Sequence, residues 1–517
     1  MASHGTSEAG GTPAGVRYEQ VDIIYFERRG LVRYAGVASL WALGVGAVIS
    51  GHFSGWNLGI GVGGWGGMLI AAILIAIMYL GLVFCIAEMS PALPHTGAAY
   101  SFARSAMGPW GGFITGLCEN VEYVITPAVV VFFIGSYLQG IFGTPLEFQP
   151  VFWVFGYVVF VGLNVAGVEL SFKVTLVVTL LALACLVAFW VSAFPVMDFS
   201  RWALNIGPDG VQLPEGNGPF LPTGLWGAFA ALPFAVWLFL AIEQLPLAAE
   251  ESIDPKRDMP KGIILGMFTL MISAFMILWL NASVPIEKSV TTNGVTEVQQ
   301  GAYALGKSAE PLLDGFRAIY GEGIAAFLAL IAVIGLIASF HTIIYAQGRQ
   351  IYSLSRAGYF PRWLSVTHGT RKTPHVAMIA GAVVGFAVML VVFFAWGAEA
   401  GGAFIGATLL NMAVFGAMLS YFLQAVSFIL LRRNLPHIER PYVSPLGIPG
   451  AVATIVIALV TIIFQLLDPV YRQGVFGVAI WFAVGIVYFA AIGRNKLVLS
   501  PEEEFALSGG RTEYRSH

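Results

Sequence analysis

The stretch LGVGAVISGHFSGWNLGIGVGG, residues 43–64, decides the fold class. Its residues are mostly apolar, as in a helix that crosses a membrane, yet glycines recur through it and His52 lies among them. Glycine destabilises a helix in water, and an ionisable side chain is costly in lipid. The stretch therefore indicates a membrane helix with a further role, either close helix packing or an interruption that binds a solute.

The whole chain has the composition of a membrane protein. Of its 517 residues, 57% are apolar and 11% are charged, whereas a soluble protein carries about a quarter charged residues. The charges fall in short islands between apolar runs of about 20 residues, the length of a membrane-crossing helix. The three cysteines lie inside apolar runs, so we expect no disulfide framework. We also expect no nucleic-acid partner, because the chain has no long basic tract.

The apolar runs predict an all-α polytopic membrane protein with twelve transmembrane helices. The predicted spans are 31–62, 66–90, 111–141, 149–168, 173–195, 223–247, 262–284, 322–346, 375–396, 402–430, 448–467 and 473–493. With the N-terminus inside, internal loops hold 21 of the 26 Lys and Arg residues. This bias predicts a multi-pass protein of the plasma membrane whose tails, 1–30 and 494–517, are both cytoplasmic. The long loops 196–222 and 285–321 are then external, and we expect connectors there, with a lid as the alternative.

The order of the spans predicts two related halves. Five spans (31–195) precede the external loop 196–222, five follow it (223–430), and two extra spans occupy 448–493. In many transporters such halves are inverted repeats, and the substrate binds where one helix of each half is interrupted. The sequence therefore predicts a five-plus-five inverted repeat with interrupted helices 1 and 6.

The two predicted interruptions lie in the first span of each half. Ser50-Gly51-His52 divides the first span, and PFAVWLFLAIEQLP, residues 233–246, divides the sixth. Unwound backbone inside a membrane protein leaves N–H and C=O groups that can bind a polar solute. We therefore expect Ser50 and Gly51 to contact substrate. The glycines that recur every fourth residue from Gly55 to Gly67 are instead expected to allow close helix packing.

Three stretches resemble the amino acid–polyamine–organocation transporter superfamily: GVGAVISG (44–51), AEMSPALPHTGAAYSFARSAMGPWGGF (87–113) and AAEESIDPKRDMPKGI (248–263). A second set resembles the ethanolamine permease family: WNLGIGVGG, ENVEYVITPAVVV, FLAIEQLPLAAEE, ASFHTIIYAQGRQIYSLSRAGYFP and LLNMAVFGAMLSYFLQAVSFILLRRNLP. The resemblance covers residues 30–495, approximately. It implies the five-plus-five fold and uptake of a small amino alcohol.

Two positions depart from the superfamily pattern. Amino acid permeases often carry a Gly-x-Gly triplet, whose amides hold the substrate carboxylate, where this chain has Ser50-Gly51-His52. Many relatives carry a lysine on the fifth helix in place of a sodium ion, near the position of Ala182 here. The resemblance therefore leaves the coupling ion open between a proton and sodium.

A cationic amine needs negative charge, and few acidic residues lie inside the spans. Glu119 and Glu122 are three residues apart on the third helix and share a face, and Glu243 follows the sixth-helix interruption. An intramembrane carboxylate is a candidate functional group because exposing it to lipid is costly. The alternative is a structural carboxylate that is bonded to the backbone or protonated. Weaker candidates stand at predicted cytoplasmic helix ends: Glu88, Glu250 and Glu251.

Aromatic, imidazole and hydroxyl groups complete the candidate site. Trp237 and Phe239 could hold an ammonium group against a ring face, with ordinary packing as the alternative. His52 could donate to a substrate hydroxyl or sense pH, or it could face an external vestibule. Ser339 and Thr342 on the eighth helix could hold a coupling ion, although helical hydroxyls more often bond to their own backbone.

These features predict a secondary active transporter that imports ethanolamine or a closely related small primary amine by alternating access. The alternative is an amino-acid or polyamine permease or exchanger of the same superfamily. A non-transporting receptor is a weaker alternative because the tails are short. We expect no enzyme activity, cofactor or metal, since HExxH and GxSxG motifs are absent. Choline transport, transport mode and oligomeric state stay open.

Overall fold

A computed structural model describes residues 15–19, 21–204, 219–292 and 295–499, together with Glu504 and Ser508. Residues 1–14 of the predicted N-terminal tail, 205–218 of the predicted external loop and most of 500–517 lie outside the described residues.

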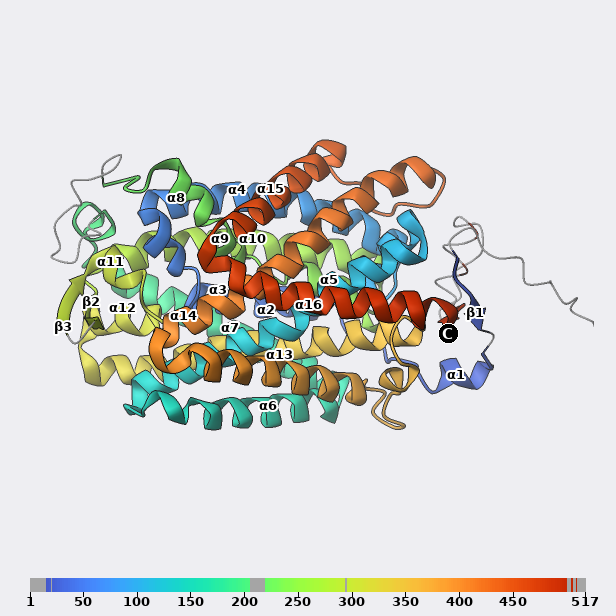
Figure 1. Ribbon diagram of the computed structural model, residues 1–517, viewed down its shortest axis with the longest axis horizontal. Helices are drawn as coiled ribbons and strands as arrows, with labels where there is room; N and C mark the ends of the chain where they lie inside the picture. Colours follow the sequence, from blue (N-terminus) through green and yellow to red (C-terminus); the bar gives the residue numbers. More distant parts are fainter. Residues whose placement is uncertain are drawn as a thin grey trace, which may run out of the picture.

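Long helices run side by side along the longest axis of the molecule (Figure 1). In chain order, the long helices and the shorter ones between them are α2 (Val37–Val48), α3 (Ser50–Phe53), α4 (Leu58–Ala92), α5 (Ala98–Phe142), α6 (Gln149–Ala166), α7 (Val168–Ala193), α8 (Gly224–Ala230), α9 (Leu232–Trp237), the 3₁₀ helix η3 (Ile242–Glu251), α10 (Pro255–Ala282), α13 (Glu322–Arg356), α14 (His375–Asn434), α15 (Gly447–Leu467) and α16 (Pro469–Ala491). Within the described residues, eleven segments are long and apolar enough to cross a membrane, and Val37–Phe53 is a shorter apolar helix. These twelve segments coincide with the twelve predicted spans, and α14 joins the ninth to the tenth.

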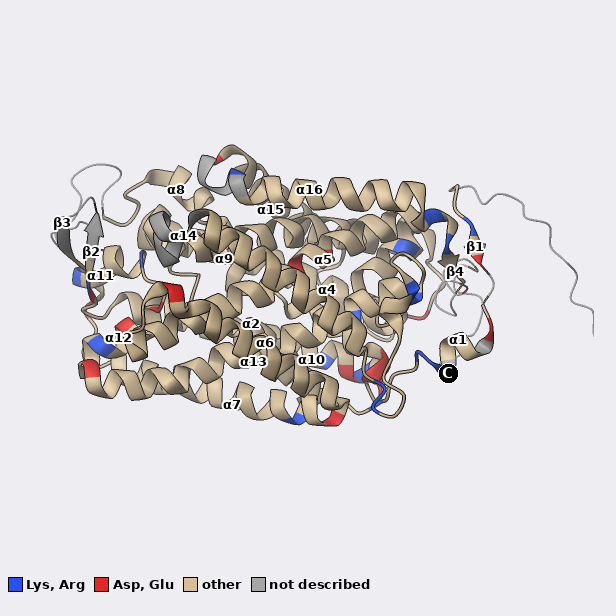
Figure 2. Cartoon of the chain, turned by 60° about the horizontal axis from the view of Figure 1, so that its bottom comes forward, with Lys and Arg blue, Asp and Glu red and all other residues tan. Residues whose placement is uncertain are grey.

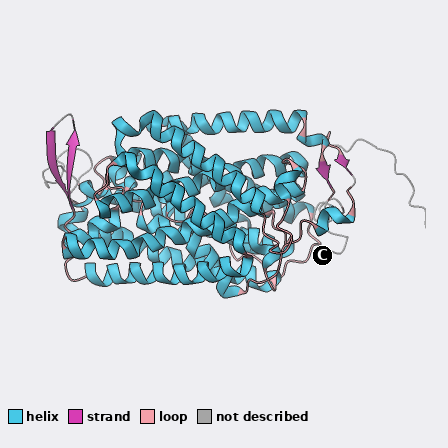
Figure 3. Cartoon of the chain, turned by 90° about the horizontal axis from the view of Figure 1, so that it is seen from below, coloured by secondary structure: helices cyan, strands magenta, loops and turns pink. Residues whose placement is uncertain are grey.

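Short elements gather at the two ends of this bundle (Figure 3). One end has β1 (Tyr18–Glu19) paired in parallel with β4 (Leu497–Val498), with α1 (Ile23–Glu27), η4 (Arg362–Ser365) and η5 (Gly493–Asn495) nearby. The other end has the antiparallel pair β2 (Glu287–Thr292) and β3 (Val295–Gln300), and α11 (Gly301–Leu305), α12 (Pro311–Tyr320), η1 (Leu146–Phe148) and η2 (Phe199–Ala203). We call the first the terminal face and the second the hairpin face.

Charged residues also gather mostly at the two ends, and the middle of the bundle is largely uncharged (Figure 2). This distribution is what a bilayer requires, because its hydrocarbon core excludes ions. The division of the chain into two inverted repeats, 31–195 and 223–430, stays a prediction.

The sixth span is interrupted where the sequence predicts. Helix α9 ends at Trp237, and η3 begins at Ile242 after a four-residue turn. Ala241 in this turn has a φ of 83°, which side-chain-bearing residues seldom adopt. The backbone is therefore irregular in the interior of the bundle, where neighbouring helices can satisfy its polar groups.

The first span is interrupted later than predicted. Ser50, Gly51 and His52 belong to α3, and Ile49, which separates α3 from α2, has helical angles (φ −60°, ψ −24°). The prediction that this triplet is unwound is therefore wrong. The regular helix ends at Phe53, since Ser54 is extended and Gly55 has a φ of 95°. Glycine adopts such a left-handed conformation without strain, so the chain can turn here.

Candidate functional site

Three carboxyl groups meet in the interior of the bundle. Glu119 and Glu122 of α5 and Glu243 of η3 are at most 1% exposed. The carboxyls of Glu122 and Glu243 face each other, and Glu119 lies within electrostatic range of both. The structure thus brings together the three acidic residues that the sequence singled out.

Tyrosine hydroxyls hold two of these carboxyls in place. Tyr421 donates to Oε1 of Glu122 (3.0 Å), and Tyr123 donates to Oε1 of Glu243 (3.2 Å). Tyr79 donates in turn to the hydroxyl of Tyr421 (3.2 Å). The other oxygen of Glu243 accepts from the Ala241 amide at the helix interruption (3.1 Å). We call these three glutamates and three tyrosines the central cluster.

Sequence reasoning did not single out the three tyrosines. Each is buried inside an apolar span, and a buried tyrosine hydroxyl usually requires a hydrogen-bond partner. The sequence shows a tyrosine inside an apolar span, but it does not show which group its hydroxyl contacts. Phe239, which the sequence did single out, adds a ring to the cluster, with its centroid 5.6 Å from that of Tyr79.

The end of the first span near His52 and Ser54 is hydrogen-bonded to the sixth span. The ring nitrogens of His52 contact the Leu238 carbonyl (Nε2, 3.0 Å) and the Ser273 hydroxyl (Nδ1, 2.8 Å). Trp237 donates from Nε1 to the Ser54 carbonyl (3.0 Å). His52 is fully buried, so the alternative that it faces an external vestibule is wrong for this conformation. Both ring nitrogens of His52 and the indole N–H of Trp237 have protein partners here.

The Ser339 hydroxyl, one of the two proposed for a coupling ion, lies against the first span. Ser50 donates to Ser339 Oγ (2.8 Å), and Ser339 donates to the Ala47 carbonyl. Thr342 donates to carbonyls of its own helix, at Ala338 (2.9 Å) and Ser339 (3.0 Å). Ser339 therefore joins α13 to the first span, and the Thr342 hydroxyl is bonded within α13.

The central cluster is closed off from the terminal face. A small apolar layer of Ala98, Leu247 and Ala346 packs with Tyr123. Beyond it, Arg349 pairs with Glu251 (2.8 Å), and the side chains of both are fully buried. These contacts join α13 to the end of η3.

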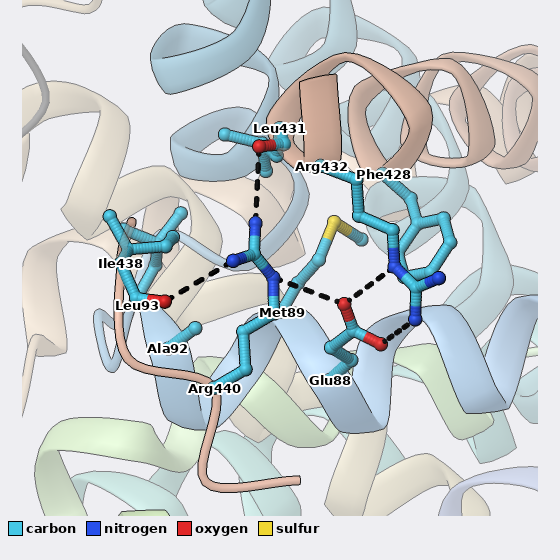
Figure 4. Close-up of a pocket in the computed structure, with 9 residues that line it drawn as sticks. All are labelled: Glu88, Met89, Ala92, Leu93, Phe428, Leu431, Arg432, Ile438 and Arg440. Carbon is cyan, nitrogen blue, oxygen red and sulfur yellow. Dashed lines mark hydrogen bonds and ion pairs between the residues drawn. The ribbon is translucent and has the colours of Figure 1, made fainter. Parts of the chain in front are cut away.

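The remaining acidic candidates also form ion pairs at the terminal face. Glu250 pairs with Arg356 (2.5 Å). Figure 4 shows Glu88 of α4 between two arginines, with Arg432 at 2.5 Å and Arg440 at 3.2 Å. Arg440 also donates to carbonyls near the end of α14. Glu88, Glu250 and Glu251 thus hold helices together in this conformation.

The hairpin face is closed by the segment that follows the second strand pair. Asn57 donates to the carbonyls of Leu305 (2.7 Å) and Ser308 (2.8 Å), and Ser54 donates to that of Ala309 (3.1 Å). The predicted loop 285–321 therefore covers the end of the first span. With both faces closed, the central cluster is occluded.

Comparison with known proteins identifies the family. The family model described as amino acid permease matches residues 36–492, from the start of α2 to the end of α16. The chain belongs to the amino acid permease family.

Several curated proteins resemble this permease over most of its length. An uncharacterised transporter of Rhizobium meliloti is 29% identical, covering 81% of this chain and 83% of its own. A branched-chain amino acid permease of Bacillus subtilis is 24% identical, covering 90% and 94%. A vacuolar cationic amino acid transporter of Arabidopsis thaliana is 26% identical, covering 83% and 65%. The substrates in the names of these relatives differ, so family membership establishes a transporter without identifying its substrate.

Proposed function

We propose that this permease is a secondary transporter that carries ethanolamine, or a closely related small primary amine, by alternating access. The observation that supports it lies in the central cluster, where the buried carboxyls of Glu122 and Glu243 face each other beside the interruption of the sixth span. A buried acidic cluster favours a cationic solute, because a cation compensates charge that the protein interior otherwise disfavours.

The Glu122–Glu243 pair has the chemistry of an ammonium site. Two carboxyls that face each other this closely cannot both ionise cheaply, so they share one proton and one negative charge. An ammonium group can then donate to oxygens that lack a donor, such as Oε2 of Glu122. Phe239 and Tyr79 supply aromatic rings beside the pair.

The backbone near the first interruption favours a substrate without a carboxylate. The amide of His52 donates to the Ile49 carbonyl (3.0 Å), and that of Ser54 donates to the Ser50 carbonyl (3.0 Å). These amides are therefore already used in helical hydrogen bonds. A carboxylate would also be repelled by the negative charge that the Glu122–Glu243 pair retains.

The closed faces support alternating access. We propose that the terminal face lies in the cytoplasm of the plasma membrane, in agreement with the excess of Lys and Arg in the predicted internal loops. Import then requires the hairpin face to open first and the ion-paired terminal face to open second. A coupling ion at Ser339 and Thr342 stays a proposal; both hydroxyls donate their hydrogens to backbone carbonyls, and a cation would have to contact the oxygen lone pairs.

A cationic amino acid is the second candidate. The same acidic cluster suits its side chain, and one relative is named as a cationic amino acid transporter. Its carboxylate would need donors, and the amides of His52 and Ser54 are already used in backbone hydrogen bonds. Competition experiments separate the two candidates directly.

The test is exchange of labelled ethanolamine across proteoliposomes that contain the purified protein. Unlabelled ethanolamine, lysine, leucine, putrescine and choline are added as competitors in parallel. Inhibition by ethanolamine with little effect of lysine or leucine supports the amine site. Absence of ethanolamine exchange, together with exchange of an amino acid, contradicts the proposal.

The first prediction concerns Glu122. Glu122→Gln removes the negative charge of the pair and is expected to lower ethanolamine exchange by about a hundredfold or more, since a desolvated charge contact is worth about 2–5 kcal/mol. Glu439→Gln is the matched control, because Glu439 is an exposed carboxylate paired with Lys256 (2.8 Å). Wild-type exchange by the Glu122→Gln protein would contradict the role of the pair.

A further inference from the structure

Glu119 differs from the other two glutamates of the central cluster in its contacts. It is fully buried, and neither carboxyl oxygen has a hydrogen-bond partner among the described residues. The backbone of Tyr100 lies beside the carboxyl. Glu122 and Glu243, by contrast, each accept a tyrosine hydroxyl.

The environment of Glu119 disfavours its ionised form. Burying a carboxylate without a cation or donors costs far more than burying the neutral acid. The nearby Glu122–Glu243 pair adds repulsion, because it retains one negative charge when it shares a proton. Burial of this kind therefore favours the neutral acid over the carboxylate at Glu119 in the occluded conformation.

Among the described residues, the titratable and charged groups around Glu119 include no counter-ion paired with it. Its own helix presents Cys118, Glu122 and Tyr123, and η3 presents Glu243. On the other elements packed against α5, Tyr421 of α14 bonds to Glu122, and Arg349 of α13 pairs with Glu251. Helix α6 carries no charged residue, and the charged residue of α16, Arg472, lies in its first turn.

The position of Glu119 suits release toward the terminal face. It precedes Glu122 by three residues on α5, which corresponds to about 4.5 Å along the helix axis. That displacement is toward the terminal face, because α5 is kinked at Gly108 and Trp110, just after the kink, packs against Phe489 near the terminal-face end of α16. The apolar layer of Ala98, Leu247 and Ala346 packs with Tyr123 and closes that face, so it covers the central cluster on the side toward which Glu119 is displaced.

We propose that Glu119 is the proton-binding residue that couples transport to a proton gradient, while the Glu122–Glu243 pair binds the amine. This inference rests on the proposed function and assigns the coupling ion. When the terminal face opens, water reaches Glu119, its O–H bond breaks, and the proton leaves as hydronium. The resulting carboxylate takes a proton from the opposite side when the hairpin face opens. One proton therefore accompanies one ammonium group, and no electrons are transferred.

The experiment separates exchange from gradient-driven accumulation in proteoliposomes. Exchange of labelled for unlabelled ethanolamine at equal pH does not require the carrier to return without its proton. Accumulation under an acid-outside pH gradient does require that step. Glu119→Gln holds a neutral side chain permanently, so exchange is expected to stay within about twofold of wild type, whereas accumulation falls about tenfold or more.

Controls make each outcome decisive. Glu439→Gln is expected to keep both activities, and Glu122→Gln to lose both. Undiminished accumulation by Glu119→Gln overturns the proposal, and so does loss of exchange by a variant that keeps the wild-type melting temperature. If Glu119→Gln does not fold, Glu119→Asp is used instead. It keeps a titratable carboxyl and is expected to retain accumulation, and loss of accumulation with intact exchange would overturn the proposal.

A spectroscopic measurement is independent of the substrate. Infrared spectra of the wild-type protein are expected to contain the C=O stretching band of a protonated carboxylic acid that is absent from Glu119→Gln. An identical band in both proteins overturns the proposal. Wild-type protein that does not exchange ethanolamine contradicts only the proposed function, and the comparison is then repeated with lysine.

Discussion

The tyrosine hydroxyls of the central cluster orient carboxyls that would otherwise have few partners. Tyr421 illustrates this, because its hydroxyl donates to Glu122 and accepts from Tyr79. A chain of hydrogen bonds in a dry interior polarises each member, so the loss of one hydroxyl affects the whole arrangement.

Tyr421→Phe removes a donor to Glu122 while keeping the ring. A hydrogen bond to a charged group contributes about 1.5–3 kcal/mol, so the KM for ethanolamine is expected to rise about tenfold or more. Tyr157→Phe is the matched control, because the buried Tyr157 hydroxyl has no hydrogen-bond partner among the described residues. Equal effects of the two substitutions on KM would contradict the assigned role of Tyr421.

Contact between the first and sixth spans depends on a position that only glycine can occupy. A Cβ at Gly51 would collide with the backbone carbonyl oxygen of Trp237. That oxygen belongs to the main chain and cannot rotate away as a side chain could. The close approach allows His52 to reach Leu238 and Trp237 to reach Ser54.

Gly51→Ala is expected to separate the two spans. Overpacking of this kind costs about 1–3 kcal/mol, so both the melting temperature and the maximal exchange rate should fall. Gly162→Ala on α6 is the control, because a Cβ there has no neighbour within 4 Å. A Gly51→Ala protein that melts and exchanges like Gly162→Ala would show that the close approach is dispensable.

Across the whole molecule, ion pairs join elements at both faces, at the hairpin face through Lys288 with Glu310 and Asp314. Glu88, Glu250 and Glu251 each pair with arginine at the terminal face. Buried pairs of this kind are strongly destabilising when one partner is lost, although the pair itself adds little net stability. They thus suit a closure that forms in one conformation and separates in another.

Arg349→Gln leaves Glu251 buried without its cation. The expected loss is about 3–5 kcal/mol of unfolding free energy, seen as a lower melting temperature in detergent. Lys256→Gln breaks the exposed pair with Glu439 and should change stability by about 0–1 kcal/mol. Similar melting temperatures for the two variants would mean that the Arg349–Glu251 contact does not restrain the terminal face.

The sequence alone determined the membrane class, the approximate positions of the twelve spans and the three acidic residues that meet in the central cluster. These inferences depend on local properties: a run of about 20 apolar residues crosses a bilayer wherever it occurs, and a carboxylate within such a run is rare. The interruption of the sixth span was also predictable from Pro233 to Pro246, because proline and polar residues disrupt a helix locally.

Only the tertiary structure decided which of these residues meet and what each one contacts. His52 contacts Leu238 and Ser273, more than 180 residues away, so its spacing in the sequence could not identify those partners. The same limit led to the wrong position of the first interruption, since α3 stays helical where Gly51 packs against Trp237. Glu119 and Glu122 looked alike in sequence, and they differ in the fold because Tyr421 reaches one carboxyl and no partner reaches the other. Long-range packing sets these contacts, and local sequence patterns carry no information about it.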